Sequence, residues 1–135
     1  MTDRDLVEKK LAFIETCISE LRRLAVPGNL ETDVKERRFV EHTLQVAIQA
    51  ALDVGAHIVA DDRLGEPTTN HEVFSLLVRA GRLAPAEGAA LKAAVGFRNI
   101  LVHGYAAVDP SVVRDVLTNH LEDLLAFVAA IRGAP

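Results

Sequence analysis

A long amphipathic stretch at residues 33–60 constrains the fold of this chain more than any other feature. Apolar residues recur there at spacings of three and four, the period of an α-helix, through about seven turns. Because the apolar arc is wide, we expect this helix to pack on two sides, one facing its own core and the other facing a second subunit. The stripe consists of Val40, Leu44, Ala47, Ile48, Ala51, Leu52, Gly55, Ile58 and Val59, broadened by Phe39, Val46 and Val54.

The other segments also follow the helical period, and no alternating strand pattern of any length interrupts them. We expect further helices over residues 3–25, 70–80, 85–103 and 110–131, separated by turns that contain Pro, Gly or Asn. Asp33, Thr69 and Asp109 are well placed to cap three of the helices. The sequence therefore predicts an all-α, up-and-down bundle of four to five helices, forming a single domain over residues 1–135.

Composition narrows the classes of protein to which the chain could belong. The 135 residues carry a formal net charge of −4, whereas a protein held to long nucleic acids by charge alone is usually basic. Any contact with nucleic acid should therefore be local. The single cysteine, Cys17, permits no internal disulfide and fits a reducing cytoplasm. The charged N-terminus lacks an apolar signal region, and no apolar run approaches the roughly 20 residues of a membrane span, so we expect no membrane partner.

The reactive side chains of the chain are concentrated in one segment, which reads FRNILVHGY from residue 97 to 105. Arg98 carries a permanent charge and a planar fork of donors that fits a phosphate. His103 belongs to the residue type that exchanges protons near neutral pH. Tyr105 adds a hydroxyl group two residues later. We expect the rest of the chain to form a helical scaffold that holds this segment in place.

The spacing of this segment raises a geometric problem. We expect Arg98 in the late part of a helix that starts at Pro85, His103 at the end of that helix, and Gly104 in a left-handed conformation that closes it. Five residues of an α-helix rotate the chain by about 140°. Arg98 and His103 should therefore not share a face. They can meet only if the helix ends or tightens near His103, or if two chains contribute to one site.

The pattern Arg98-x4-His103-x-Tyr105 resembles the signature of the HEPN superfamily, in which an arginine is followed by four to six residues and a histidine. The added tyrosine is similar to the HepT toxin branch of that superfamily. The similarity extends to residues 37–48 and 52–55, which resemble the second helix of that branch, and it covers most of the chain. The arginine and histidine alone would be a weak signal, but the tyrosine and the long helix make the resemblance fairly specific.

The resemblance implies a metal-independent endoribonuclease without a cofactor, acting as the toxin of a toxin–antitoxin pair of the type II or type VII kind. It implies three partners: RNA as substrate, a minimal nucleotidyltransferase as antitoxin, and a second copy in a homodimer whose two motifs face each other across one cleft. The antitoxin would silence the toxin by transferring AMP to Tyr105. A cleft built from two chains would also resolve the geometric problem of the motif.

Metal-free RNA cleavage needs a proton-transfer group and positive charge for the transition state. We assign proton transfer to His103 and the phosphate oxygens to Arg98. Asn99 could donate a hydrogen bond to the same phosphate or orient His103. Arg37 lies in the family-like segment and could line the RNA path or meet the antitoxin. AMP on Tyr105 would fill the phosphate site with bulk and negative charge.

Other interpretations remain open. Arg98 could simply pair with an acid, and Arg37 could belong to a solvated face on which it pairs with Glu41. Asp53 and His57 are spaced as metal ligands can be, but no third ligand matches, so a hydrogen-bonded pair without metal is expected. The alternative function is a non-catalytic helical dimer that binds a nucleotide or a partner protein in the same groove. The intact motif favours the nuclease, whereas the acidic net charge slightly favours the binding module.

Overall fold

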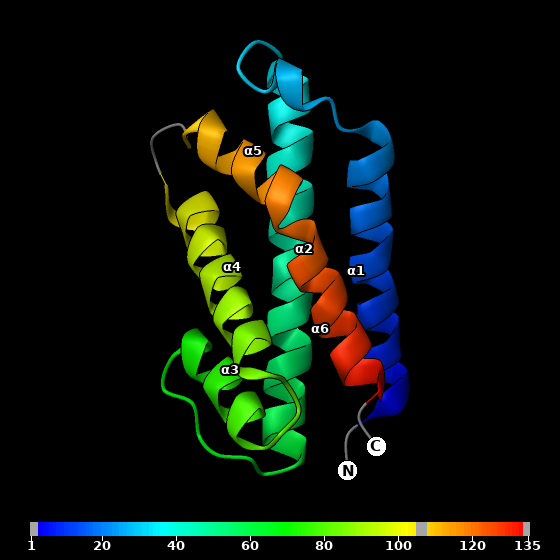
Figure 1. Ribbon diagram of the computed structural model, residues 1–135, viewed down its shortest axis with the longest axis vertical. Helices are drawn as coiled ribbons and strands as arrows, with labels where there is room; N and C mark the ends of the chain where they lie inside the picture. The colour runs from blue at the N-terminus through cyan, green and yellow to red at the C-terminus, as the bar shows by residue number, and fades with distance from the viewer. Residues whose placement is uncertain (1–2, 105–107, 134–135) are drawn as a thin grey trace.

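The computed structural model describes residues 3–104 and 108–133, and these residues form six α-helices and one short 3-10 helix. The elements are α1 (Arg4–Leu24), η1 (Pro27–Asn29), α2 (Val34–Asp61), α3 (Asn70–Arg79), α4 (Pro85–His103), α5 (Pro110–Asn119) and α6 (Leu121–Gly133). Successive long helices run in opposite directions (Figure 1), and α2 contacts each of the other five α-helices. The prediction of an all-α, up-and-down bundle is confirmed.

The central helix α2 begins where its N-cap was predicted. The carboxylate of Asp33 accepts hydrogen bonds from the backbone N–H groups of Lys35 at 2.9 Å and Glu36 at 3.4 Å. By length and apolarity alone, this 28-residue helix could cross a membrane. However, 61% of its most apolar window is buried inside the bundle, which is the environment of a core helix. The apolar stripe therefore serves the fold of this chain.

The core of the bundle includes the single cysteine. Phe74 of α3 and Phe127 of α6 meet edge to face in this core, with ring centroids 6.2 Å apart. Cys17 is only 3% exposed, and burial raises the pKa of its thiol to about 11. Because the thiolate is the nucleophilic form, this thiol is inert at neutral pH.

The C-terminal segment differs from the prediction, because the single helix expected over residues 110–131 is two helices. The break lies at His120, whose backbone adopts φ −122° and ψ 3°. Nδ1 of its ring lies 2.8 Å from a carboxylate oxygen of Asp123, and Nε2 lies 3.3 Å from one of Asp115. The hydrogen bond with Asp123 raises the pKa of His120 above its ordinary value. The apolar period continues across the break, so the pattern alone predicted one helix and four to five helices in total.

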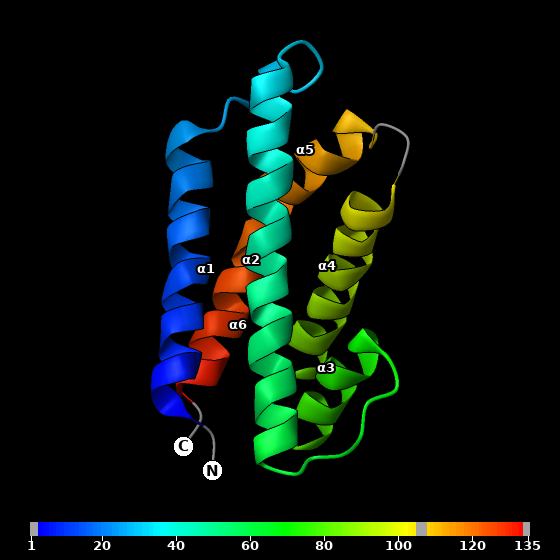
Figure 2. The same cartoon turned by 180° about the vertical axis from the view of Figure 1, so that it is seen from behind.

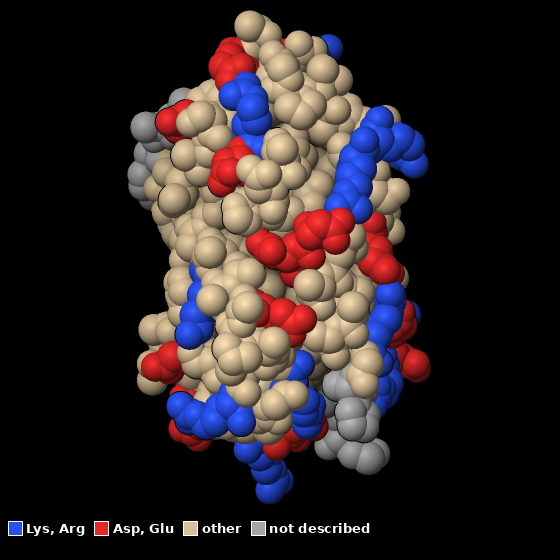
Figure 3. Space-filling view, viewed as in Figure 1, with Lys and Arg blue, Asp and Glu red and all other residues tan. Residues whose placement is uncertain are grey.

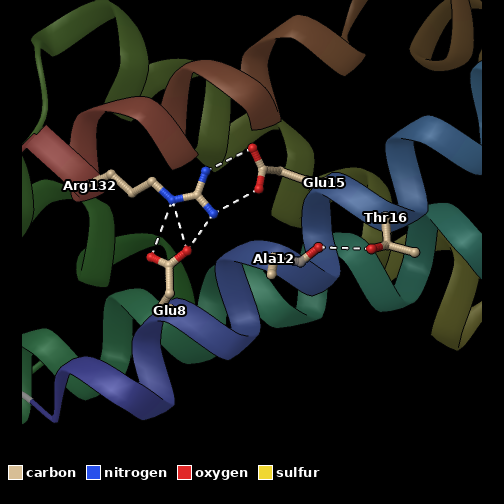
Figure 4. Close-up of polar contacts among 5 residues, drawn as sticks. All are labelled: Glu8, Ala12, Glu15, Thr16 and Arg132. Atoms are coloured by element: carbon tan, nitrogen blue, oxygen red, sulfur yellow. Dashed lines mark hydrogen bonds and ion pairs between the residues drawn. The ribbon is translucent and has the colours of Figure 1, made fainter.

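Arg132, in the last turn of α6, joins that helix to α1 (Figure 4). Its Nη2 group donates hydrogen bonds to Glu8 at 2.6 Å and to Glu15 at 2.7 Å, and Nη1 donates to the other oxygen of Glu15 at 2.8 Å. Glu8 and Glu15 are two helical turns apart and therefore share a face of α1. One guanidinium thus bridges two carboxylates and closes the bundle.

We expect Arg132→Gln to lower the melting temperature by a few degrees at pH 7 and by less at pH 3. The hydrogen bond from Arg132 holds the pKa of the Glu15 carboxyl below its ordinary value. A group with a depressed pKa contributes stability above its unfolded pKa and loses it as the pH falls through its folded pKa. The effect is small because these side chains are solvated. Thermal unfolding followed by circular dichroism would measure it, with the exposed Arg79→Gln as control, and an equal shift at both pH values would contradict the mechanism.

Candidate functional site

The predicted site lies on the C-terminal turns of α4. Arg98 is half-buried and His103, the last residue of the helix, is exposed. The start of this helix is held firmly, because Gly88 packs so closely on α3 that an added Cβ would lie 2.4 Å from a methyl group of Val78. The motif is therefore carried by a helix that is anchored at its other end.

The end of α4 remains α-helical as far as His103. The backbone N–H of Gly104 donates to the carbonyl of Ile100 at 2.8 Å, which is the spacing of an α-helix. Gly104 has φ −77° and ψ 105°, so the left-handed conformation expected there is wrong. Because the helix does not tighten, Arg98 and His103 stay on different faces, and no hydrogen bond joins them within the described residues. One chain does not bring the pair together.

The guanidinium of Arg98 is held by two neutral oxygen atoms. Its Nε–H donates to Oε1 of Gln49 at 2.7 Å, and Nη1 donates to Oδ1 of Asn99. A guanidinium has five N–H donors, so three remain after these two contacts. No carboxylate pairs with Arg98 within residues 3–104 and 108–133. The alternative interpretation, in which Arg98 pairs with an acid, is therefore wrong, and the positive charge remains available to an anion.

A row of polar contacts extends from Arg98 across the outer face of α2. The Nε2 group of Gln49 donates to Oδ1 of Asp53 at 2.8 Å, and Nζ of Lys10 lies 3.6 Å from the other oxygen of Asp53. The row therefore links α4, α2 and α1, which lie side by side in Figure 2. Sequence reasoning missed Gln49, although a polar pair four residues apart in an apolar helix was a visible signal.

The pair predicted between Asp53 and His57 does not form. Asp53 contacts Gln49 and Lys10 instead of His57, and His57 lies 3.3 Å from Asp61. The hydrogen-bonded pair expected between Asp53 and His57 is therefore wrong. Among the described residues, no group of three His, Cys, Asp or Glu side chains could hold a metal ion.

The supporting residues have different environments. Asn99 turns its carbonyl oxygen toward Arg98 and holds the arginine, and no hydrogen bond joins it to His103 within the described residues. Arg37 is half-buried in the first turn of α2, and its side chain has no hydrogen bond or ion pair within the described part of the chain, so the pair with Glu41 is absent. The first turn of α2 and the last turn of α4 point toward the same end of the bundle (Figure 2). Tyr105 lies outside the described residues.

One face of the molecule carries no extended positive charge. Figure 3 shows the face that carries α5 and α6, where acidic side chains lie across the middle and basic side chains lie toward the margins. No continuous basic tract crosses the described residues of this face. This face therefore offers no broad positive surface to a nucleic acid.

Comparison with known proteins gives consistent results. The family model "Ribonuclease HepT-like" matches residues 14–131. The chain is 30% identical to an mRNA nuclease HepT of Shewanella oneidensis over 96% of this chain and 98% of that protein. It is 28% identical to a tRNA nuclease HepT of Aphanizomenon flos-aquae over 95% of this chain and 88% of that protein.

Solved structures resemble the bundle as a whole. One is a toxin–antitoxin structure with AMP-PNP, at a TM-score of 0.91 and 29% identity, covering 97% of this chain and 100% of the other. Another is the tri-AMPylated HEPN toxin of Shewanella oneidensis in complex with an MNT antitoxin, at a TM-score of 0.90 and 28% identity, covering 98% and 100%. The likeness spans the helices that carry the motif as well as those that support it.

Proposed function

We propose that this chain, which belongs to the HepT-like ribonuclease family, is a metal-independent endoribonuclease that acts as the toxin of a toxin–antitoxin pair. The observation that carries the proposal is the state of Arg98. Its guanidinium is fixed by two neutral oxygens, retains three free donors and has no carboxylate partner within the described residues. Such a group is prepared to bind a phosphate.

The chemistry follows from the substrate, because RNA carries its own nucleophile. His103 takes the proton of the ribose 2′-hydroxyl, and the 2′-oxygen attacks the adjacent phosphorus. The bond from phosphorus to the 5′-oxygen breaks, and that oxygen receives a proton from an acid in the site. The products are a 2′,3′-cyclic phosphate and a 5′-hydroxyl end. Arg98 stabilises the additional negative charge on the phosphate oxygens in the transition state.

The working site requires two copies of the chain. Arg98 and His103 diverge by about 140° around a regular helix, so a second chain must supply the missing partner of each. Ile100 and Val102, between them in the sequence, are 51% and 41% exposed. Apolar side chains in this position fit a contact between the α4 helices of two copies. We therefore propose a homodimer in which the two motifs face each other across one cleft.

The second partner is a nucleotidyltransferase antitoxin that silences the toxin by transferring AMP to Tyr105. Support comes from the similar tri-AMPylated toxin in complex with its MNT antitoxin. An added AMP would place a phosphodiester two residues from His103, and its negative charge would compete with RNA for Arg98. A cytoplasmic location fits an RNA substrate, the single buried thiol and a central helix whose apolar face lies within the bundle.

Cleavage of RNA in the presence of EDTA tests the proposed function. We expect the purified protein to cleave RNA without added metal, leaving cyclic phosphate and 5′-hydroxyl ends that mass spectrometry identifies. The mass of the intact protein must be measured in parallel, because added AMP would mean that the silenced form had been purified. Failure of the unmodified protein to cleave any RNA would contradict the ribonuclease and favour a helical dimer that only binds a nucleotide or a partner protein.

A further inference from the structure

We propose that Gln49 is a positioning residue for the guanidinium of Arg98, and that Asp53 fixes the orientation of the Gln49 side chain. This inference rests on the proposed ribonuclease function, since it concerns the group that would bind the RNA phosphate. Gln49 lies in the middle of α2, between Ile48 and Ala50, both of which are buried. Its side chain therefore starts from a well-packed part of the bundle.

The hydrogen-bonding capacities of the three groups allow one arrangement only. A carboxylate accepts hydrogen bonds and a guanidinium only donates them, whereas a primary amide does both. The amide of Gln49 must therefore turn its NH2 group to Asp53 and its oxygen to Arg98. The two distances, 2.8 Å and 2.7 Å, show both contacts made. The ammonium group of Lys10 lies 3.6 Å from the second oxygen of Asp53 and holds this carboxylate from the side of α1.

The two contacts on Arg98 fix the plane of its guanidinium. Gln49 holds Nε from α2, and Asn99 holds Nη1 from the same helix as Arg98 itself. Among the residues that the structure describes, Nη2 and the second hydrogen of Nη1 have no hydrogen-bond partner. Two N–H groups on this edge can bind a phosphate in the bidentate manner that arginine favours. Two contacts from different directions reduce the rotamer entropy that RNA binding would otherwise have to overcome.

The neutrality of Gln49 is part of the proposed role. A carboxylate at this position would hold the guanidinium as well, but it would compensate the charge that the phosphate needs and would also repel Asp53. Asp53 orients the amide of Gln49, and the amide holds Arg98 through a neutral oxygen atom. Gln49 lies between Asp53 and the guanidinium, so Asp53 orients the amide but does not pair with Arg98.

Three variants separate geometry from charge. Gln49→Leu removes the acceptor for Arg98, and we expect kcat to fall about ten- to a hundred-fold, as for a misplaced catalytic group. Gln49→Glu keeps the acceptor, but its carboxylate compensates the positive charge of Arg98. We expect a comparable loss of kcat and, in addition, a rise in KM. Asp53→Asn permits the wrong orientation of the amide, and we expect a smaller loss. Gln45→Leu is the matched control, because this other glutamine of α2 has no hydrogen bond within the described residues.

A second measurement does not depend on activity. In the His103→Ala background, the Nε–H resonance of Arg98, assigned by its disappearance in Arg98→Lys, should exchange slowly with water. We expect Gln49→Leu to make this exchange fast while Gln45→Leu leaves it slow. A slow resonance in Gln49→Leu would overturn the proposal.

The two readouts also distinguish failure of this inference from failure of the proposed function. If the wild type cleaves RNA and Gln49→Leu cleaves it equally fast, the positioning role is overturned and the ribonuclease stands. If the wild type does not cleave RNA, the proposed function fails. The exchange rate of the Arg98 Nε–H group would then still decide whether Gln49 holds the guanidinium.

Discussion

Replacing His103 by alanine is expected to reduce RNA cleavage about a hundred- to ten-thousand-fold, the range that positioned acid–base groups contribute. His103 is the exposed last residue of α4, so the substitution removes no packed side chain and should leave the melting temperature nearly unchanged. Initial rates on a defined RNA in EDTA, measured with protein shown by mass to be free of AMP, would quantify the loss.

The suitable control for that experiment is His71→Ala. His71 lies in the first turn of α3, and its side chain has no hydrogen bond within the described residues. Figure 1 shows α3 at the opposite end of the bundle from the C-terminal end of α4. A nuclease contaminant would be unaffected by either substitution. Equal cleavage by the wild type and His103→Ala, in preparations shown to be free of a contaminating nuclease, would remove His103 from the mechanism.

A dimer with one Arg98→Ala chain and one His103→Ala chain is expected to recover about half of the wild-type activity, although each variant alone is inactive. In a composite site, the arginine of one chain works with the histidine of the other. The mixed dimer then contains one site with both groups and one with neither. Co-expression with two different affinity tags and purification over both would isolate this mixed dimer for the cleavage assay.

The same experiment can contradict the composite site. If Arg98 and His103 of one chain acted together, neither site of the mixed dimer would be complete, and no activity would return. The comparison requires dimers of each single variant, purified in the same way, to measure exchange of subunits and residual cleavage. The oligomeric state can be measured by light scattering or analytical ultracentrifugation. A protein that is monomeric in solution would also contradict a site composed of two chains.

Much of the fold could be predicted because it depends on local patterns. The stripe of α2, the cap at Asp33 and the stops at Pro and Gly residues act within a few turns of chain, and the structure places α2 within one residue of its predicted bounds. The break at His120 could not be predicted in this way. An imidazole lies between Asp115 and Asp123 at the break, and these contacts leave the apolar period unchanged.

The site was predictable to a lesser extent. The sequence placed Arg98 late in α4 and His103 at its end, because both positions follow from the helix that starts at Pro85. It did not identify Gln49, which is 49 positions from Arg98 in the chain and meets it only because α2 packs on α4. Contacts between helices depend on the rotation of each helix in the bundle, which a hydrophobic stripe defines too coarsely for hydrogen bonds.

The burial of Cys17 makes its thiol a probe for the opening of the bundle. Its thiol points into the core from α1, and its raised pKa leaves almost no thiolate at neutral pH. A thiol reagent therefore reacts only when α1 opens, so the rate of labelling reports on the opening of that helix. Since this is the only cysteine of the chain, the label needs no engineered background. The rate at which Cys17 is labelled can be compared between the free chain and its complexes. The comparison shows whether a partner slows the opening of the bundle.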